Sequence, residues 1–378
     1  MLAREESLNM LLVISSALSL KARYGASGFS QLRERMLSLE HDLSTPSDPA
    51  WMFFPDDPDS AARFRMQPMA MSSPPVVLQL LWAFQRLYQF TSNDAVLLLG
   101  GGDVVPFAEL PNPAMSTVDP DMTIESDSPY GFFANRAAQA FQAGAVPDFP
   151  VGRVPDFQPA NQNGFLALLD LLGSPPASSR SGTFAVVNEA WRSPTDQILD
   201  GSGTIRTTPP WCAKNSEWKT QGAELLYFNL HGFNNSPTWR GFDESSGNWV
   251  DAVSPGDIAA EAVSGAIVFT ENCYGGLVSG RSPKNSVALS MLAAGARAFI
   301  GSTGIAFGSF SQQPDTPVEA DVLGGDFVRQ IRAGQTVGQA FANARRDFSN
   351  ATSPVAWQAD RQKTISEFVL YGNPLATL

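Results

Sequence analysis

Two apolar runs that each lead to a chemically reactive residue constrain the fold of this chain more than any other feature. Residues 224–230 (ELLYFNL) lead directly into His231, and residues 265–270 (GAIVFT) are followed three positions later by Cys273. Continuous apolar runs of this length are typical of strands in parallel sheets, which are buried on both faces. The sequence therefore predicts two core strands, each with a candidate catalytic residue at its carboxyl end.

A short helix is expected between these two strands. Ser254 is a suitable N-cap and Pro255 fits the first helical position, so the helix should begin there and end near Ser264. Two strands joined through a helix form a crossover unit, in which the strands are parallel and their carboxyl ends share one edge of the sheet. Ligands and catalytic groups of open α/β sheets gather at that edge. His231 and Cys273 are therefore expected to be neighbours in space, although 42 positions (273 − 231) separate them.

A histidine and a cysteine at one sheet edge are the parts that a thiol-dependent hydrolase requires. The Cys273 thiolate would be the nucleophile, and the His231 imidazole would lower the pKa of the thiol and later protonate the leaving amine. The backbone N–H groups of Gly232 and Cys273 are the natural donors to the oxyanion of a tetrahedral intermediate. Glycines after both residues would leave the backbone open to a substrate.

Each of these residues also has a less specific interpretation. A single cysteine after a core strand is usually a packing residue, and a single histidine is usually a hydrogen-bonded polar group. The chain contains only two histidines, His41 and His231, and two cysteines, Cys212 and Cys273. One of each at matched strand ends favours the catalytic interpretation, with His41 on a helix surface and Cys212 in a structural position. The four residues lack any zinc-ligand spacing, so no zinc site is expected.

Composition and charge exclude several classes of protein. A chain of 378 residues suits two α/β halves or one large domain. The net charge of −12 and the lack of a basic run argue against a nucleic-acid-binding surface. Two cysteines cannot form a disulfide framework, which fits a reducing compartment. Residues 8–20 are apolar, but Glu5 and Glu6 precede them and they are too few to span a bilayer, so we expect a cytoplasmic protein without a membrane anchor.

Periodicity and turn signals divide the remaining chain into helices and strands. Helices are expected at residues 29–43, 75–90, 161–172, 287–295, 318–333 and 336–348, and strands at residues 9–15, 95–99, 148–155, 183–188 and 298–300. The segment at residues 173–182 is rich in serine and proline and is the best candidate boundary. We therefore predict an amino-terminal α/β subdomain at residues 1–175 and a second, catalytic α/β subdomain at residues 176–378.

Three consecutive glycines at residues 100–102 follow the strand expected at residues 95–99. A phosphate-binding loop is one interpretation, but no Lys-Ser/Thr pair follows and the GxGxxG spacing is absent. A tight exit from the strand is the better account. A nucleotide-binding α/β protein is therefore a weaker hypothesis than a peptidase or a catalytically silent module of the same fold.

A long segment at residues 111–130 carries four carboxylates, at Asp119, Asp121, Glu125 and Asp127. Clustered carboxylates can hold calcium, but the EF-hand spacing is missing and acidic loops are usually solvated. A calcium ion at this acidic loop is thus the alternative to a plain solvated loop, and no other cofactor is expected.

Taken together, the sequence resembles the gingipain-like cysteine peptidases within the wider group of caspase, legumain, separase and clostripain. His231-Gly232 and Cys273 match the catalytic pair at the ends of adjacent strands in that family. The other similar stretches, in the family's order, are residues 96–106 (VLLLGGGDVVP), 126–131 (SDSPYG), 149–155 (FPVGRVP), 298–304 (AFIGSTG) and 370–374 (LYGNP). The resemblance spans most of the chain, and the ordered set is more specific than any one motif.

This resemblance implies a caspase-like three-layer α/β/α sandwich with a mainly parallel sheet and two similar subdomains. It also implies that Cys273 is the nucleophile, that His231 is the general acid/base and that Gly232 helps to form the oxyanion hole. An orienting carboxylate is not required, because this group often works with a Cys-His dyad.

Substrate preference is less clearly marked in the sequence. Glu271 and Asn272 precede the nucleophile where caspases have Gln-Ala, so a caspase-type preference for aspartate is not expected. Gingipain-like enzymes commonly cleave after Arg or Lys by means of an acidic pocket. Asp127 is one candidate for that pocket, and Asp243 or Glu244 would serve equally on charge.

The predicted function is endopeptidase cleavage of a protein or peptide substrate through a Cys273 thioester. The resemblance implies an intracellular, regulated protease of the kind that acts beside signalling or defence partners in bacteria. The alternative is a catalytically silent member of the same fold that serves as an interaction or scaffold module. The presence of both catalytic residue types favours the enzyme.

Overall fold

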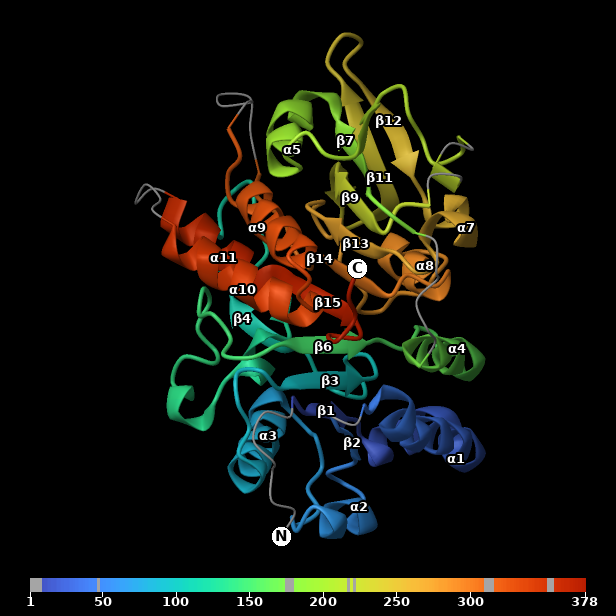
Figure 1. Cartoon of the computed structure of the whole chain (residues 1–378), viewed down its shortest axis with the longest axis vertical. Coiled ribbons are helices and arrows are strands. Elements are labelled where there is room, and N and C mark those ends of the chain that lie inside the picture. Colours follow the sequence, from blue (N-terminus) through green and yellow to red (C-terminus); the bar gives the residue numbers. More distant parts are fainter. Residues whose placement is uncertain are drawn as a thin grey trace.

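A computed structural model of the chain describes residues 9–45, 48–173, 180–215, 218–219, 222–308, 316–351 and 357–378. Within these residues, one large sheet forms the centre of the molecule (Figure 1). Its strands are β1 (Leu11–Ile14), β2 (Ala50–Phe53), β3 (Ala95–Leu99), β6 (Val151–Val154), β7 (Thr183–Asn188), β8 (Thr204–Thr208), β9 (Leu225–Asn229), β13 (Ile267–Thr270), β14 (Ala298–Ser302) and β15 (Phe368–Gly372). The strand order is β2-β1-β3-β6-β15-β14-β13-β9-β7-β8.

The large sheet consists of two parallel halves that run in opposite directions. Strands β2, β1, β3, β6 and β15 are parallel to one another, and so are β14, β13, β9, β7 and β8. The halves meet where β14 and β15 pair antiparallel, with Phe299 opposite Tyr371. The expectation of a mainly parallel sheet is therefore confirmed. The predicted subdomain boundary falls on residues 174–179, outside the described residues, and the division into two subdomains stays a prediction.

Helices cover both faces of the sheet and complete three layers. One face carries α9 (Ala320–Arg332), α10 (Val337–Asn350) and α11 (Gln358–Glu367), and the other carries α1 (Ala17–Leu43), α4 (Gln162–Leu172) and α8 (Val287–Ala293) (Figure 1). Further helices are α2 (Pro58–Arg63), α3 (Pro74–Tyr88), α5 (Arg192–Ile198) and α7 (Ala260–Val263). The three-layer α/β/α architecture expected from the sequence is confirmed.

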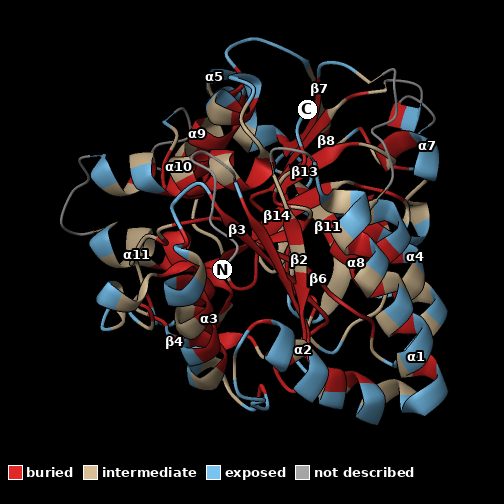
Figure 2. Cartoon of the chain, turned by 60° about the horizontal axis from the view of Figure 1, so that its bottom comes forward, coloured by how far each residue is buried: buried red, intermediate tan, exposed pale blue. Residues whose placement is uncertain are grey.

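Two hydrophobic cores lie on opposite faces of the half-sheet that contains β9 and β13. Successive side chains of a strand point to opposite faces, so neighbouring residues of β9 and β13 enter different cores. Tyr227 and Phe269 pack in the core beneath α9 and α10. Leu226 and Val268 pack in the core that includes α8. Buried residues follow the strands through the centre of the molecule, with exposed residues on the outer sides of the helices (Figure 2).

The first long helix begins earlier than its periodicity indicates. α1 starts at Ala17, where the Ser16 side chain accepts a hydrogen bond from the backbone N–H of Ser19. Gly25 interrupts the helix with a positive φ of 72°. The turns before this break could not be predicted from periodicity, because a continuous apolar stripe is present only from Phe29 onward.

Two small antiparallel sheets were not expected from the sequence. One contains β10 (His231–Phe233), β11 (Ser236–Asp243) and β12 (Asn248–Val253), and the other contains β4 (Ala108–Pro111) and β5 (Thr123–Ser126). The helix predicted to run from residue 254 to residue 264 is only a 3₁₀ turn, η4 (Pro255–Asp257), followed by α7. Its predicted start is confirmed, because Ser254 and Asp257 form a capping box. The link between β9 and β13 is therefore mostly a three-stranded sheet.

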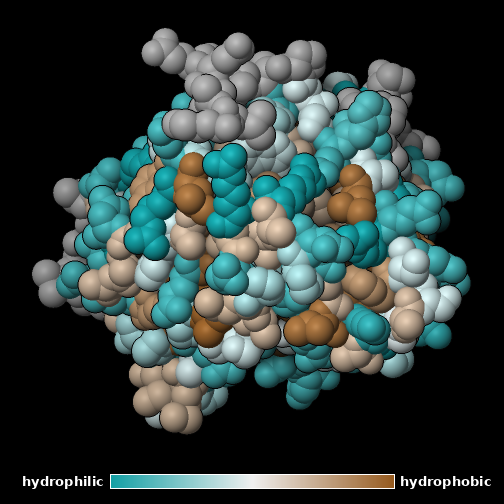
Figure 3. All heavy atoms as spheres, turned by 90° about the horizontal axis from the view of Figure 1, so that it is seen from below, coloured by the Kyte–Doolittle hydropathy of each residue, from teal (hydrophilic) through white to brown (hydrophobic). Residues whose placement is uncertain are grey.

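No helix among the described residues is both long enough and apolar enough to cross a bilayer. Figure 3 shows the end of the molecule that lies lowest in Figure 1, near α2 and β2, where apolar side chains occur as separate spots among hydrophilic ones. Such scattered exposure is normal for a protein surface.

Candidate active site

The strand register places the two predicted catalytic residues at the same level of the sheet. β9 and β13 are parallel, with Leu225 opposite Ile267, an offset of 42 positions (267 − 225). The same offset separates His231 from Cys273. Both residues therefore follow their strands at one edge of the sheet, as the crossover argument predicts.

The backbones that carry these two residues are in direct contact. A Cβ atom on Gly232 would lie only 1.9 Å from the carbonyl oxygen of Cys273 and 3.3 Å from its backbone nitrogen. One position earlier in each segment, the backbone N–H of Leu230 donates to Oδ1 of the buried Asn272 at 2.7 Å. Position 232 therefore requires glycine because no side chain has room there. The structure therefore brings the backbone at Gly232 against the backbone at Cys273, and the catalytic roles of His231 and Cys273 stay a prediction.

The Cys273 thiol is protonated in this structure at neutral pH. Burial raises the pKa of the thiol to about 11. The Sγ atom lies 3.5 Å from the backbone carbonyl oxygen of Ala306, to which the thiol donates. Tyr274, the next residue, has a positive φ of 55°, an uncommon conformation for a residue with a side chain. Such backbone conformations are concentrated at functional sites, where the surroundings hold them in place.

The His231 imidazole is held between two tryptophan rings. The ring centroids of Trp191 and Trp249 lie 4.4 Å and 4.8 Å from the imidazole. Burial lowers the pKa of His231 to about 4, so the ring is neutral at neutral pH. In the described part of the chain, no side chain forms a hydrogen bond with the imidazole. The thiol and the imidazole are therefore both neutral, and the imidazole has a lone pair free to accept a proton.

The raised thiol pKa predicts how Cys273 reacts with an alkylating reagent. In a Cys212→Ser background, the rate of iodoacetamide labelling should rise about tenfold per pH unit between about pH 6 and pH 9, because only the thiolate reacts and its fraction keeps growing below the pKa. Mass spectrometry of the labelled protein measures the rate. The urea-unfolded protein is the control, and its rate should level off above the ordinary thiol pKa of about 8.5. A plateau below about pH 8 in the folded protein would contradict the prediction.

The four carboxylates of the acidic segment bind four separate partners. The pairs are Asp119 with Lys363, Asp121 with the Tyr274 hydroxyl, Glu125 with the Ser279 hydroxyl, and Asp127 with Arg153. They do not converge on one point, and the described residues contain no group of three or more His, Cys, Asp or Glu side chains able to hold a metal ion. The calcium site considered from the sequence therefore finds no support here. Through Asp121 and Glu125, the segment instead binds Tyr274 and Ser279, which follow Cys273, and so connects them to the half of the sheet that contains β3 and β6.

Asp127 is engaged by a buried arginine. Its two carboxylate oxygens accept hydrogen bonds from Arg153 at 2.6 Å and 2.8 Å, and both side chains are buried. The Arg153 guanidinium also donates to the backbone carbonyls of Gly100 and Val105, each at 2.7 Å. A carboxylate whose two oxygens both bind a buried guanidinium has little charge left for a substrate. Asp127 therefore joins β5 to β6 in this structure.

The other two carboxylates considered for substrate binding lie on a hairpin turn. Asp243 ends β11 and Glu244 is exposed in the turn that follows. Hydrogen bonds from the hydroxyl groups of Ser245 and Ser246 lower the pKa of Asp243 to about 2. No described hydrogen bond or ion pair links either carboxylate to His231 or Cys273.

Sequence reasoning missed a buried acidic pair close in sequence to the candidate nucleophile Cys273 and in contact with the strands before it. Glu271, two positions before Cys273, is buried and lies close to Asp321 at the start of α9. Burial raises the pKa of Glu271 well above its usual range, and the Asp321 carboxylate raises it further. Glu271 Oε1 accepts from the Tyr227 hydroxyl, and Asp321 accepts from Asn229, two positions before His231. We refer to Glu271 and Asp321 as the acidic pair.

The acidic pair borders both the loop that contacts the thiol and an open groove. A Cβ atom on Gly308 would lie 3.5 Å from Asp321 Oδ2 and 3.7 Å from Glu271 Oε2. Asp321 also lines a groove of about 640 Å³ between α5 and α9. Glu271 could have been suspected from its place two residues before the nucleophile, whereas nothing local marks Asp321.

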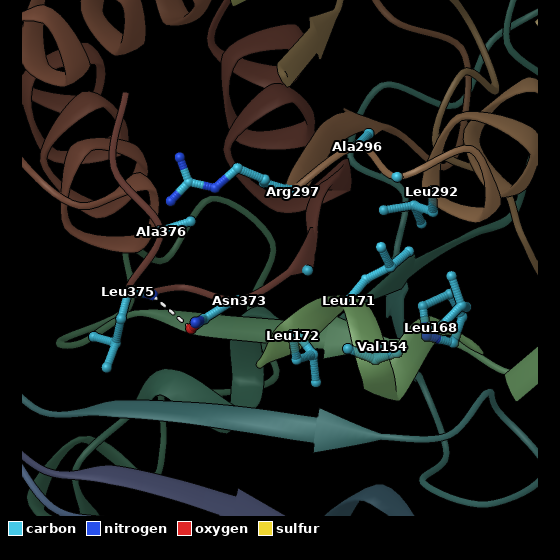
Figure 4. A pocket seen from close by; sticks show the side chains of 13 residues that line it. Val154, Leu168, Leu171, Leu172, Leu292, Ala296, Arg297, Asn373, Leu375 and Ala376 are labelled. Carbon is cyan, nitrogen blue, oxygen red and sulfur yellow. Dashed lines mark hydrogen bonds between the residues drawn. The ribbon is translucent and has the colours of Figure 1, made fainter. Parts of the chain in front are cut away.

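A separate cavity lies near the amino end of β14, at the edge of the sheet opposite to His231 and Cys273. It has a volume of about 120 Å³ and is enclosed by α4, α8 and the residues that flank β15 (Figure 4). Its lining is mainly leucine and alanine, with Arg297 and Asn373 among the polar members. It adjoins the amino end of β14, whereas His231 and Cys273 follow the carboxyl ends of β9 and β13. The cavity contains no thiol, imidazole or carboxylate, so we place no catalysis there.

Two solved structures share the arrangement of this chain. The crystal structure of the Arg-specific cysteine proteinase gingipain R matches this chain with a TM-score of 0.61 at 13% sequence identity, over 100% of this chain and 79% of that chain. A second structure, described as a protease, matches with a TM-score of 0.56 at 10% identity, over 99% of this chain and 79% of that chain. This is a caspase-like fold.

The remaining comparisons add nothing beyond the caspase-like fold. The separase–securin complex of Saccharomyces cerevisiae matches with a TM-score of 0.40 at 11% identity, over 92% of this chain and 22% of that chain. No family model matches the sequence, and no curated protein matches it by sequence. The expected resemblance in fold to gingipain R is confirmed, while identities this low say nothing about individual residues.

Proposed function

We propose that this protein is a cysteine endopeptidase in which Cys273 attacks the scissile carbonyl and His231 transfers the proton. The observation that carries the proposal is the contact between Gly232 and Cys273, which holds a thiol and a neutral imidazole at the matched ends of two parallel strands. The peptidases that share the caspase-like fold support it.

The proposed reaction uses only groups of the chain and one water molecule. The His231 imidazole takes the proton of the Cys273 thiol as the thiolate attacks the carbonyl carbon. The oxyanion accepts hydrogen bonds from the backbone N–H groups of Gly232 and Cys273. When the tetrahedral intermediate collapses, the imidazolium gives its proton to the leaving amine and a thioester remains. Water, deprotonated by His231, then attacks the thioester and releases the acid and the thiol.

The resting contact between the thiol and Ala306 implies that the enzyme is regulated. A thiol with a pKa of about 11 is a weak nucleophile, and its hydrogen bond to the Ala306 carbonyl has to break before attack. Movement of the segment that carries Ala306 would release the thiol and uncover the acidic pair, because Gly308 in the same segment lies against both carboxylates. Both cysteines are free, which is compatible with the reducing, cytoplasmic setting that we propose.

We further propose that cleavage follows a basic residue that the acidic pair recognises. Two carboxylates close to the nucleophile, one of them lining an open groove, form a site for a guanidinium or ammonium group. An incoming cation would favour the ionised form of Glu271 and so counteract the burial that raises its pKa. The description of gingipain R as Arg-specific agrees with this preference.

Peptides that differ only in the residue before the scissile bond test this proposal. For the wild type, we expect kcat/KM to be at least about tenfold higher with Arg or Lys than with Leu. Glu271→Gln removes one charge of the acidic pair and should lower the Arg-to-Leu ratio about tenfold, because a cation loses an ionic partner while an apolar side chain does not. Glu261→Gln, an exposed position on α7, is the matched control and should keep the wild-type ratio. An unchanged ratio in Glu271→Gln would place the basic-residue pocket elsewhere.

The alternative is a catalytically silent module of the same fold, and the contact of the Cys273 thiol with the Ala306 carbonyl is the observation that favours it. If no peptide is cleaved and Cys273 stays unlabelled by a peptidyl acyloxymethyl ketone with Arg at its end, the silent module is the better description. Labelling of Cys273 without turnover would instead indicate an enzyme held in its resting state.

A further inference from the structure

The three-stranded sheet β10-β11-β12 has one packed face and one open face. On the packed face, Trp239, Ala252 and Val253 are buried, and the Trp239 ring lies 5.3 Å from Phe228 and 6.3 Å from Phe299 of the large sheet. These contacts belong to the core that includes α8. The 3₁₀ helix η3 (Glu189–Trp191) covers part of the other face, where Trp191 contacts His231, and β11 and β12 project at the upper end of the molecule in Figure 1.

The candidate catalytic histidine stands on the open face. His231 is opposite Arg240, and Phe242 is opposite Trp249 in the strand register. Residues two apart in a strand share a face, so His231, Phe233, Phe242 and Trp249 lie on the same side. We call these four residues the aromatic face.

Trp249 is the centre of the aromatic face. Its ring centroid lies 4.8 Å from His231, 5.3 Å from Phe233 and 5.0 Å from Phe242. In spite of these contacts, the Trp249 side chain is 48% exposed. Grouped aromatic side chains that remain open to solvent are typical of recognition surfaces, because tryptophan provides a large contact area with few rotatable bonds.

The chemistry of the proposed reaction determines which part of a substrate meets the aromatic face. The imidazole that protonates the leaving amine has to lie on the side of the scissile bond where that amine departs. The residue after the scissile bond therefore passes next to His231 and the ring packed against it, Trp249. The acidic pair lies on the opposite face of the large sheet, beside α9. A substrate that crosses the sheet edge at Cys273 would thus contact the acidic pair before the bond and the aromatic face after it.

We propose that the aromatic face binds the substrate segment that follows the scissile bond and selects a large apolar or aromatic side chain there. This inference deepens the proposed peptidase function and rests on it. The charged residues on the same face, Arg240 and Asp251, form an ion pair at 2.8 Å, so the face offers no unbalanced charge to a charged side chain. Trp249 is the residue that determines the preference.

Internally quenched peptides with a fixed Arg before the bond and either Phe or Gly after it test this inference. For the wild type, we expect kcat/KM to be about tenfold higher with Phe than with Gly. Trp249→Ser should bring this ratio close to one, and Trp249→Phe should restore most of it. Leu87→Ser on α3 is the matched control, because Leu87 is apolar and 52% exposed, and it should keep the wild-type ratio.

The Phe-to-Gly ratio of kcat/KM shows whether Trp249 recognises the substrate or only supports the His231 imidazole. If Trp249 only holds His231 in place, Trp249→Ser will slow both peptides alike and leave the ratio unchanged, which would overturn the inference. A ratio near one in the wild type would overturn it too, while cleavage itself would uphold the peptidase.

A binding measurement covers the case in which no peptide is cleaved. Titration of Cys273→Ala with Phe-Ala-Ala-amide and with Gly-Ala-Ala-amide, followed by tryptophan fluorescence, should give about tenfold tighter binding of the Phe peptide. Addition of Trp249→Ser should abolish the difference. Binding of this kind, in a protein whose wild type neither cleaves peptides nor is labelled at Cys273, would refute the peptidase and leave the aromatic face as the recognition site of a silent module. Equal affinities would refute the aromatic face.

Discussion

Replacing Cys273 with alanine is expected to lower kcat/KM by at least about 10⁴-fold for every peptide that the wild type cleaves, because removal of a catalytic nucleophile leaves only binding and oxyanion stabilisation. The folded structure should persist, since the change removes a single sulfur atom. Circular dichroism and thermal unfolding verify folding, and fluorogenic peptides measure the activity. Cys212→Ala is the matched control and should retain wild-type activity, because the Cys212 thiol donates to Asn215, at 3.8 Å, and not to a residue of the candidate site.

The histidine variant sharpens this test. His231→Ala should cause a loss of similar size, and the double variant should lose little more, because a nucleophile and its base act as one unit. Full cleavage by Cys273→Ala would refute the thioester mechanism. Losses that simply multiply in the double variant would indicate that the two residues act independently.

The second large effect is expected from adding one methyl group at Gly232. In Gly232→Ala, the new Cβ would lie 1.9 Å from the carbonyl oxygen of Cys273, far inside any allowed contact, so one of the two backbones has to move. We expect a loss of stability of about 3 kcal/mol, at the upper end of the usual cost of overpacking. We also expect kcat/KM to fall by about 100-fold or more, because small misplacements of reacting groups are costly.

Gly256→Ala is the matched control for this experiment. Gly256 lies in the η4 turn near the same crossover, and a Cβ atom there would meet nothing within 4 Å. Urea unfolding and peptide cleavage should therefore give values close to those of the wild type. If Gly232→Ala were as stable and as active as Gly256→Ala, the close approach of the His231 and Cys273 segments would be wrong.

The central part of the site could be predicted from the sequence because it depends on strands that are buried on both faces. The runs before His231 and Cys273 are continuous and apolar, and parallel pairing through a crossover follows from them. The strand register pairs residues of β9 and β13 that are 42 positions apart, and the same number of positions separates His231 from Cys273. The two residues therefore lie at one edge of the sheet. These inferences need no knowledge of distant side chains.

The parts that could not be predicted depend on partners far away in the sequence. Asp127 looked available to a substrate, but it binds Arg153, whose place is known only once β6 lies beside β3. The acidic pair joins Glu271 to Asp321, 50 positions later (321 − 271), and no local signal links them. Partners of this kind are specified by the fold and not by spacing along the chain.

The small sheet that carries His231 was missed for a different reason. Residues 236–253 are mostly half-buried or exposed, so they lack the apolar runs that mark a core strand. Antiparallel strands with one solvated face alternate between apolar and polar residues, and the serine-rich and glycine-rich turn after Asp243 obscures that alternation.

The position of β15 has a consequence for the order in which the protein is made. This strand follows all the others in sequence, yet it lies in the middle of the large sheet, between β6 and β14. While the ribosome is still adding residues before 368, the two half-sheets have no strand between them, and each keeps an open inner edge. Open edges favour mispairing during folding. Synthesis of residues 368–372 closes both edges at once, so the large sheet cannot be complete before these residues have been added.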